Sequence, residues 1–163
     1  MDQKIEVRRA SDGEIEAARQ LTNRSWLTTY AALIGETETR KIIATRHSGA
    51  VFQEQAADAA SDFFVAVKDG GVVGHSHSYA KDGYYIDRLH VEPDLKGAGI
   101  GGMLLRHMEA DLARGTRVWL EVLDGNDNAV AFYQHCGFVP QRRTDACGGV
   151  AGVPAVILEK TIN

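Results

Sequence analysis

One segment limits the fold of this chain more than any other. It combines a strand-like run ending at Val91, a short loop, and a cluster of glycines that opens a helix, and it reads V-E-P-D-L-K-G-A-G-I-G-G up to Gly102. The first turn of a helix presents N–H groups without partners and the positive end of the helix dipole, and glycines let a bound group approach the backbone. The segment therefore predicts a helix N-terminus that binds an anion, typically phosphate, with Lys96 at its rim. A glycine-rich turn that serves only helix packing is the alternative.

The rest of the chain surrounds this segment with strand and helix patterns. Strands are expected at 4–9, 63–68, 72–81, 84–91, 117–123, 138–143 and 155–160, and helices at 11–30, 36–47, 51–60, 99–113 and 127–136. Ser11 and Glu14 form a capping box at the first helix, and the Asp82–Gly83 pair predicts a hairpin. Interleaved strands and helices with both hairpins and crossovers indicate a mixed α/β or α+β sheet. No linker or repeat divides the chain, so we expect one domain over 1–163.

Composition excludes several classes of protein. The 163 residues include 18 Lys and Arg against 22 Asp and Glu, a formal net charge of -4 that argues against nucleic acid as a partner. No apolar run approaches the roughly 18 residues of a membrane span, and the charged N-terminus lacks a secretion signal. Two cysteines, Cys136 and Cys147, are too few for a disulfide framework and fit a reducing compartment. We expect a cytoplasmic protein with neither membrane nor nucleic-acid partner. We assign Cys136 to packing, and Cys147, which we expect in a glycine-rich loop, no role.

The glycines also fit a dinucleotide-binding pattern. Gly97, Gly99 and Gly102 satisfy G-x-G-x-x-G, and Glu121 follows at a strand end. However, residues 92–96 separate the strand from the first glycine, the pattern comes after four expected strands, and the chain after Gly102 is too short for the rest of a doubly wound sheet. A nicotinamide-dinucleotide site is therefore disfavoured, and a Walker A loop is excluded because no G-K-[ST] follows.

Two motifs in the correct order carry a resemblance to a known family. I-D-R-L-H-V at 86–91, followed by K-G-A-G-I-G at 96–101, resembles motif A of the GCN5-related N-acetyltransferase (GNAT) superfamily. L-E-V at 120–122, followed by N-D-N-A-V-A-F-Y-Q-H-C-G-F-V at 126–139, resembles its motif B. The match covers about 84–140, and 25–34 resembles the first-helix region of small members. Lys96 stands where Gln or Arg is usual, which keeps the charge of arginine but loses the planar fork.

The resemblance implies a fold and a donor. The fold is a mixed, twisted, mostly antiparallel sheet of about seven strands, splayed between the fourth and fifth and flanked by helices. The donor is acetyl-CoA, with its pyrophosphate on the glycine loop and its pantetheine arm paired with the main chain of Leu89 and Val91. The implied donor-binding residues are Leu89, His90, Val91, Lys96, Gly97, Ala98, Gly99, Ile100, Gly101, Gly102, Asn126 and Tyr133. A backbone N–H near Leu89–His90 would meet the oxyanion.

The resemblance also implies catalytic roles. Tyr133 matches the tyrosine of motif B and would protonate the departing thiolate, although a tyrosine packed in the core is the alternative. Asp87 would serve as the general base, directly or through water. Strand alternation and a two-residue turn place Arg88 and three histidines on the opposite face: His75, His77 and His90. The histidines could supply the base or line an acceptor cleft, and a half-polar strand face covered by the first helices is the alternative. The spacing of the histidines matches no metal signature, and no metal is expected. Asn126 would bind the donor arm or cap its helix.

The acceptor is the least readable part of the site. Trp26 and Tyr30 share a helical face, and with His77 they are the expected acceptor contacts, although core packing is the alternative. Glu36 and Glu38 could hold a cationic amine or be surface charges. The expected function is direct transfer of the acetyl group of acetyl-CoA to a primary amine of a small molecule. The alternatives are a protein or peptide N-acetyltransferase and a non-catalytic acyl-CoA sensor, and a homodimer is compatible with the resemblance.

Overall fold

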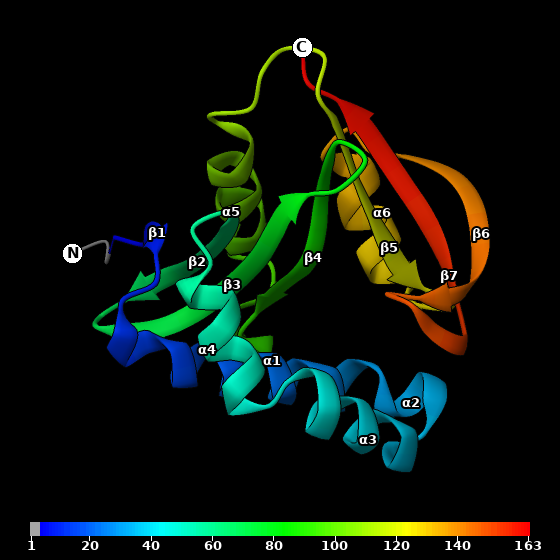
Figure 1. The fold of residues 1–163 in the computed structure, drawn as a ribbon, viewed down its shortest axis with the longest axis horizontal. Coiled ribbons are helices and arrows are strands. Elements are labelled where there is room, and N and C mark those ends of the chain that lie inside the picture. The colour runs from blue at the N-terminus through cyan, green and yellow to red at the C-terminus, as the bar shows by residue number, and fades with distance from the viewer. Residues whose placement is uncertain (1–3) are drawn as a thin grey trace. The chain divides into compact units, whose positions relative to one another are not determined.

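The structure, a computed structural model, describes residues 4–163 (Figure 1). Its elements in chain order are β1 (Glu6–Arg9), η1 (Asp12–Glu14), α1 (Ile15–Thr29), α2 (Ala31–Ile34), α3 (Glu36–Arg46), α4 (Gly49–Ala57), β2 (Ser61–Lys68), β3 (Gly71–Ala80), β4 (Tyr84–Val91), η2 (Pro93–Leu95), α5 (Ile100–Glu109), β5 (Arg117–Leu123), α6 (Asp127–His135), β6 (Val139–Cys147) and β7 (Val150–Thr161). No helix in this described range is long and apolar enough to cross a membrane.

The strands form a seven-stranded mixed sheet in the order β1-β2-β3-β4-β5-β7-β6. β4 and β5 pair in parallel, whereas β1 with β2, β5 with β7, and β6 with β7 pair antiparallel. The β4–β5 ladder has only the pairs Tyr84–Val118 and Tyr85–Trp119, while β5 pairs with β7 along its whole length. The expected adjacency of the fourth and fifth strands is confirmed, and the pairs described between them end at Tyr85.

The chain divides into two compact units. The first contains the chain up to Ser78 and Arg88–Asp111, and the second contains Tyr79–Asp87 and Leu112–Asn163. β3 and β4 each contribute residues to both units. The units are described in turn.

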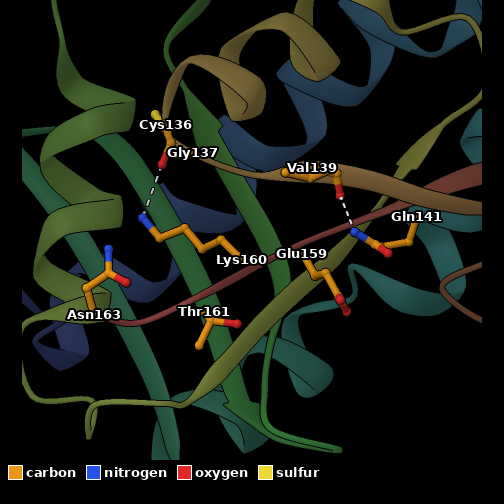
Figure 2. Close-up of a pocket in the computed structure, with 8 residues that line it drawn as sticks. All are labelled: Cys136, Gly137, Val139, Gln141, Glu159, Lys160, Thr161 and Asn163. Atoms are coloured by element: carbon orange, nitrogen blue, oxygen red, sulfur yellow. Dashed lines mark hydrogen bonds between the residues drawn. The ribbon is translucent and has the colours of Figure 1, made fainter.

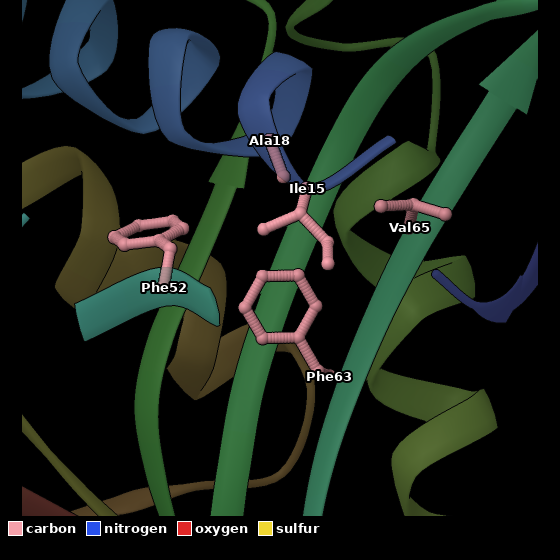
Figure 3. Close-up of a cluster of buried hydrophobic side chains, with 5 residues drawn as sticks. All are labelled: Ile15, Ala18, Phe52, Phe63 and Val65. Atoms are coloured by element: carbon pink, nitrogen blue, oxygen red, sulfur yellow. The ribbon is translucent and has the colours of Figure 1, made fainter. Parts of the chain in front are cut away.

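The first unit buries both faces of β2. On one face, Phe63 and Val65 of β2 pack with Ile15 and Ala18 of α1 and with Phe52 of α4 (Figure 3). On the other face, the core contains Ala66 and two residues of α5, Ile100 and Leu104. Because both faces of β2 are covered, its sequence is nearly continuously apolar, F-F-V-A-V at 63–67.

A glycine lets α5 approach the sheet closely. A methyl group added to Gly74 of β3 would lie 2.9 Å from Cγ2 of Ile100, 2.9 Å from Cδ1 of Leu104 and 3.2 Å from Cβ of Ala66. These separations are well inside the 3.5–4.0 Å optimum for carbon atoms, so only glycine fits there without movement of these side chains or of the helix that carries two of them. Gly74 therefore helps to fix the position of the helix that carries the glycine loop.

The second unit has an aromatic core. Tyr85, Trp119 and Ile157 are buried together with Tyr79 beside them, and the Tyr85 and Trp119 rings lie 4.5 Å apart. The indole Nε1–H of Trp119 donates to the carbonyl of Lys81 at 2.8 Å, which satisfies the buried donor. Asp82 and Gly83 both have positive φ, as the predicted D-G turn requires.

β6 is the edge strand of the second unit. Most of its side chains are exposed, Val139 to 57%, and its pairing with β7 shifts register between Pro140 and Arg142 and again around Ala146. Arg143 forms an ion pair with Asp124 at 2.6 Å.

Several predicted boundaries were wrong. The helix expected at 99–113 is α5, which ends at Glu109. The helix expected at 51–60 is α4, which ends at Ala57, because Ser61 already belongs to β2. The strands expected at 138–143 and 155–160 extend as β6 and β7 to Cys147 and from Val150, so the segment expected to be a loop is a long hairpin. The helix expected at 11–30 begins as the 3-10 turn η1, and Ser11 N–H donates to Glu14 Oε1 at 2.9 Å, which confirms that arm of the capping box.

Candidate active site

The glycine loop has the predicted open form. After β4, the N–H of Glu92 donates to Val73 O at 2.9 Å, and η2 leads into the loop. Gly97 and Gly99 have φ of 92° and 83°, in the left-handed region that favours glycine. Apart from the adjacent residues of the chain, no atom of residues 4–163 lies within 4 Å of the position that a Cβ would take on either glycine. The loop therefore leaves open space next to its backbone.

The loop delivers unpaired amides at the start of α5. Helical hydrogen bonding begins at Met103, whose N–H donates to Gly99 O at 3.1 Å. The amides of Ile100, Gly101 and Gly102 belong to the first turn, which has no acceptor within the helix. Lys96 is exposed, and within residues 4–163 its side chain makes no ion pair or hydrogen bond. A helix N-terminus and a free ammonium group give this end of α5 the chemistry of a phosphate site.

β4 presents two different faces next to the loop. Leu89 and Val91 pack on the cluster that contains Ile100 and Leu104 of α5. His90 points the other way, because its Nδ1 lies 2.9 Å from the hydroxyl of Ser25 on α1. The alternation predicted for this strand is confirmed over these residues.

A second contact joins α1 to the end of β4. Nη2 of Arg24 lies 2.7 Å from Oε2 of Glu92. Together with the Ser25–His90 contact, it connects the helix that carries the expected acceptor residues to the strand expected to bind the donor arm.

Burial and the neighbouring charge of Arg88 keep His75 of β3 neutral. His75 is fully buried; its Nδ1 lies 2.9 Å from Phe64 O, and its Nε2 accepts from Nε of Arg88 at 3.3 Å. Since a carbonyl only accepts, Nδ1 must carry the proton. Burial and the Arg88 charge hold the pKa of His75 well below its usual value. His75 thus has a structural role in place of the expected base or cleft role.

The other members of this face are also largely buried. Arg88 is 6% exposed, donates to Gln55 Oε1 at 2.6 Å and lies 4.1 Å from the centre of the Phe52 ring. His77 is 3% exposed, with its ring 6.2 Å from that of Phe63. Within residues 4–163, no group of three or more His, Cys, Asp or Glu side chains could hold a metal ion.

The two aromatic residues expected to contact the acceptor lie together at the end of α1. The rings of Trp26 and Tyr30 lie 4.3 Å apart, edge to face, and Trp26 also contacts the ring of His47 at 5.0 Å. Nε1 of Trp26 is buried and has no hydrogen-bond partner within the described chain. An indole N–H without an acceptor is a donor that a polar ligand could satisfy.

The acidic residues of α3 are already paired. Glu36 forms an ion pair with Arg40 at 2.9 Å and Glu38 with Lys41 at 3.2 Å, and all four side chains are more than half exposed. Both carboxylates therefore belong to surface pairs along the helix, which agrees with the surface-charge alternative.

In the second unit, the motif B residues lie on α6. Asn126 caps this helix, since its Oδ1 accepts from Ala129 N–H at 3.4 Å. Tyr133 is 7% exposed, with its ring 5.0 Å from that of Phe132 and 5.4 Å from that of Phe138. Capping and aromatic packing are thus present, and they leave the donor-side roles of both residues as proposals.

The sequence did not predict the hydrogen bonds that Glu121 makes in this unit. Glu121 of β5 accepts from Tyr85 Oη at 3.2 Å through one oxygen and from the N–H of Gly148 at 2.8 Å through the other. Burial, Glu121 and Asp87 together raise the pKa of Tyr85. The L-E-V match to motif B was the signal that could have directed attention to Glu121, which the sequence connected only with a dinucleotide site.

The second unit also has a polar cavity of about 440 Å³ (Figure 2). It is lined by Cys136, Gly137, Val139, Gln141, Glu159, Lys160, Thr161 and Asn163. Nζ of Lys160 donates a hydrogen bond to the Cys136 carbonyl at 3.1 Å, and Oε2 of Glu159 accepts one from Nε of Arg117. Its charged groups are therefore engaged by the protein itself, and we assign the cavity no role.

Comparison with known proteins first identifies the fold. The structure of a PaiA N-acetyltransferase from Thermoplasma acidophilum, solved with coenzyme A, matches over 97% of this chain and 99% of its own, with a TM-score of 0.82 and 22% identity.

The family follows from the sequence. Residues 17–138 match the model of the acetyltransferase (GNAT) family, and the chain belongs to that family. A streptothricin acetyltransferase of Streptomyces lavendulae is 40% identical over 88 residues, which are 50% of this chain and 46% of that protein. The N-alpha-acetyltransferase RimI of Mycobacterium tuberculosis is 46% identical over 55 residues, 34% of each chain. The matched segments thus span between a third and a half of these curated relatives.

Proposed function

We propose that this protein is an N-acetyltransferase that moves the acetyl group of acetyl-CoA directly to a primary amine of a small molecule. The observation that carries the proposal is the open glycine loop on the N-terminus of α5, with the unpaired Lys96 beside it, in a chain of the GNAT family. The coenzyme A bound to the PaiA protein supports the donor. The streptothricin acetyltransferase supports a small-molecule acceptor, whereas the RimI relative makes a peptide N-terminus the second candidate.

The donor would use backbone more than side chains. Its diphosphate would receive the amides of the first turn of α5, from Ile100 to Gly102, with the Lys96 ammonium adding charge. The pantetheine arm would pair with the main chain of Leu89 and Val91, and Asn126 is the proposed side-chain contact to it. Because amides recognise the phosphates, lysine in place of the usual Gln or Arg can be tolerated.

The transfer makes one C–N bond and breaks one C–S bond. The neutral amine attacks the thioester carbon, and the negative charge that develops on the carbonyl oxygen would be met by a backbone N–H near Leu89–His90. The departing thiolate then needs a proton, which we propose comes from the hydroxyl of Tyr133. Replacing Tyr133 by Phe should lower kcat at least tenfold while the Kd of acetyl-CoA stays unchanged. Equal turnover by the variant would remove Tyr133 from the mechanism.

The amine reaches the site as an ammonium ion and must lose a proton before it attacks. Asp87 is the proposed proton acceptor, and a histidine or water are the alternatives. Asp87→Asn should flatten the rise of kcat/KM with pH, because the variant cannot take up the proton. An unaltered pH profile would exclude Asp87. We propose Trp26, Tyr30 and His77 as acceptor contacts; the buried, unpartnered Nε1 of Trp26 supports that role for Trp26.

The first test of the function needs no acceptor. The melting temperature is followed during titration with acetyl-CoA, CoA and NAD; a ligand that binds only the folded state at a hundred times its Kd adds about 2.7 kcal/mol. A shift of the melting temperature with acetyl-CoA supports the proposal, and a shift with NAD alone would favour the dinucleotide site instead.

Acetylation is then assayed on spermidine, streptothricin, a peptide with a free N-terminus and a lysine peptide. Donor binding without turnover of any amine would favour a sensor, and turnover of peptides alone would favour the protein acceptor. Light scattering on the same sample tests for a homodimer.

A further inference from the structure

A second cation lies one helical turn beyond the glycine loop. Arg106 follows Gly102 by four residues on α5, so the two share one face of the helix. A methyl group added to Gly102 would lie only 3.3 Å from Nη1 of Arg106. The guanidinium is thus folded back along the helix and rests against the glycine, because helical side chains lean toward the N-terminus and Gly102 offers no side chain to block it.

This guanidinium has no partner within the protein. Arg106 is exposed, and no ion pair or hydrogen bond joins it to another residue in 4–163. Five other arginines of the same unit each pair with a carboxylate: Arg8, Arg9, Arg19, Arg24 and Arg40. The arginine that lies over Gly102 is therefore one that the fold leaves unneutralised, as a site for an anionic ligand requires.

We propose that Arg106 is a ligand of a donor phosphate. Its guanidinium lies over Gly102, whose amide belongs to the first turn of α5, so backbone donors and a fixed positive charge converge on one face of the helix. A guanidinium donates two parallel hydrogen bonds to phosphate, which an ammonium cannot. Arg106 thus supplies the planar fork that Lys96 lacks. The inference rests on acetyl-CoA being the donor.

The test compares three variants by calorimetric titration. Arg106→Gln removes the charge, Arg106→Lys keeps it, and Arg40→Gln removes an exposed arginine of α3 that pairs with Glu36. Each is titrated with CoA and with dephospho-CoA, which lacks the 3′-phosphate but keeps the diphosphate. For Arg106→Gln we expect the Kd of CoA to rise about tenfold, as the loss of one charge-assisted contact predicts. Arg106→Lys should recover part of this loss, and Arg40→Gln should match the wild type. The melting temperatures without ligand should coincide.

The two ligands identify the phosphate. An equal loss for both places Arg106 on the diphosphate, which we expect, and a loss for CoA alone places it on the 3′-phosphate. If Arg106→Gln binds both ligands as tightly as Arg40→Gln does, the inference is wrong. Failure of the proposed donor gives a different result, because the wild-type protein itself would then bind neither ligand. A sensor that binds the donor without turnover would still show the loss in Arg106→Gln.

Discussion

Replacing Gly74 by Ala tests whether α5 packs as closely against β3 as the structure describes. The added methyl would meet Cγ2 of Ile100 and Cδ1 of Leu104 at 2.9 Å, so both must retreat by roughly 0.6–1 Å to reach ordinary contact. Overpacking of this kind costs about 1–3 kcal/mol, and the lower entropy of the unfolded alanine chain returns about 0.4–1 kcal/mol. We expect a net loss of about 1–2 kcal/mol.

The assay is urea unfolding followed by circular dichroism, combined with titration of CoA. A loss of this size corresponds to about 3–6 °C in melting temperature for a chain of this length. CoA affinity should fall as well, because the helix that moves carries the glycine loop. Leu104→Val in the Gly74→Ala background should relieve part of the cost, and a double-mutant cycle would measure the coupling between the two sites.

Gly71→Ala is the matched control. A methyl group at Gly71 meets only the carbonyl of Lys68 at 3.6 Å, an ordinary contact, and Gly71 stands on the same strand. This variant should be as stable as the wild type or slightly more stable. If Gly74→Ala also proved as stable as the wild type with unchanged CoA affinity, the close approach of α5 to β3 would be refuted.

Two further predictions concern charge and backbone conformation. The hydrogen bonds from Arg8 hold the pKa of Glu14 at about 2, against 4.5 for a free carboxyl group. The stability this ion adds is complete above about pH 4.5 and is lost as the pH falls toward 2, so Glu14→Gln should unfold in less urea than wild type at pH 6 and show a shallower loss between pH 4.5 and 2. If the stabilities of the two proteins fell in parallel between pH 4.5 and 2, the prediction would be contradicted. In the hairpin between β3 and β4, Gly83→Ala should lower the free energy of unfolding by about 3 kcal/mol or more, measured by urea unfolding. Gly83 has φ of 108°, and a methyl group there would overlap the carbonyl oxygen of Arg117. A soluble variant with wild-type stability would refute it.

Local patterns were enough to predict the glycine loop and the helix after it. The glycine cluster after the strand predicted where α5 begins, and open amides follow from any helix start, so this half of the site needs no distant contact. The prediction failed where distant parts of the chain determine structure. The glycine-rich segment around Cys147 has the composition of a loop, yet β6 and β7 continue through it because each satisfies the other's backbone groups.

The polar contacts were the least predictable part. Sequence alternation placed His75 and Arg88 on one face, but it did not predict the proton on Nδ1, which the contact with Phe64 O fixes. Nor did it predict the neutral state of His75, which depends on complete burial and on the charge of Arg88. In the same way, Glu121 reaches Gly148 only because the hairpin brings residue 148 back to β5. For Arg106, the four-residue spacing to Gly102 is visible in the sequence, whereas its lack of a partner is not.

The exposed edge strand β6 has a consequence for the behaviour of the protein at high concentration. Pro140 offers no N–H, the register shifts twist the strand, and arginines at 142 and 143 place charge along it. Each of these features makes it harder for a strand of another molecule to extend the sheet. A second copy of the chain would gain little by adding a strand to this edge. We expect β6 to protect the protein from strand-mediated aggregation during synthesis and concentration.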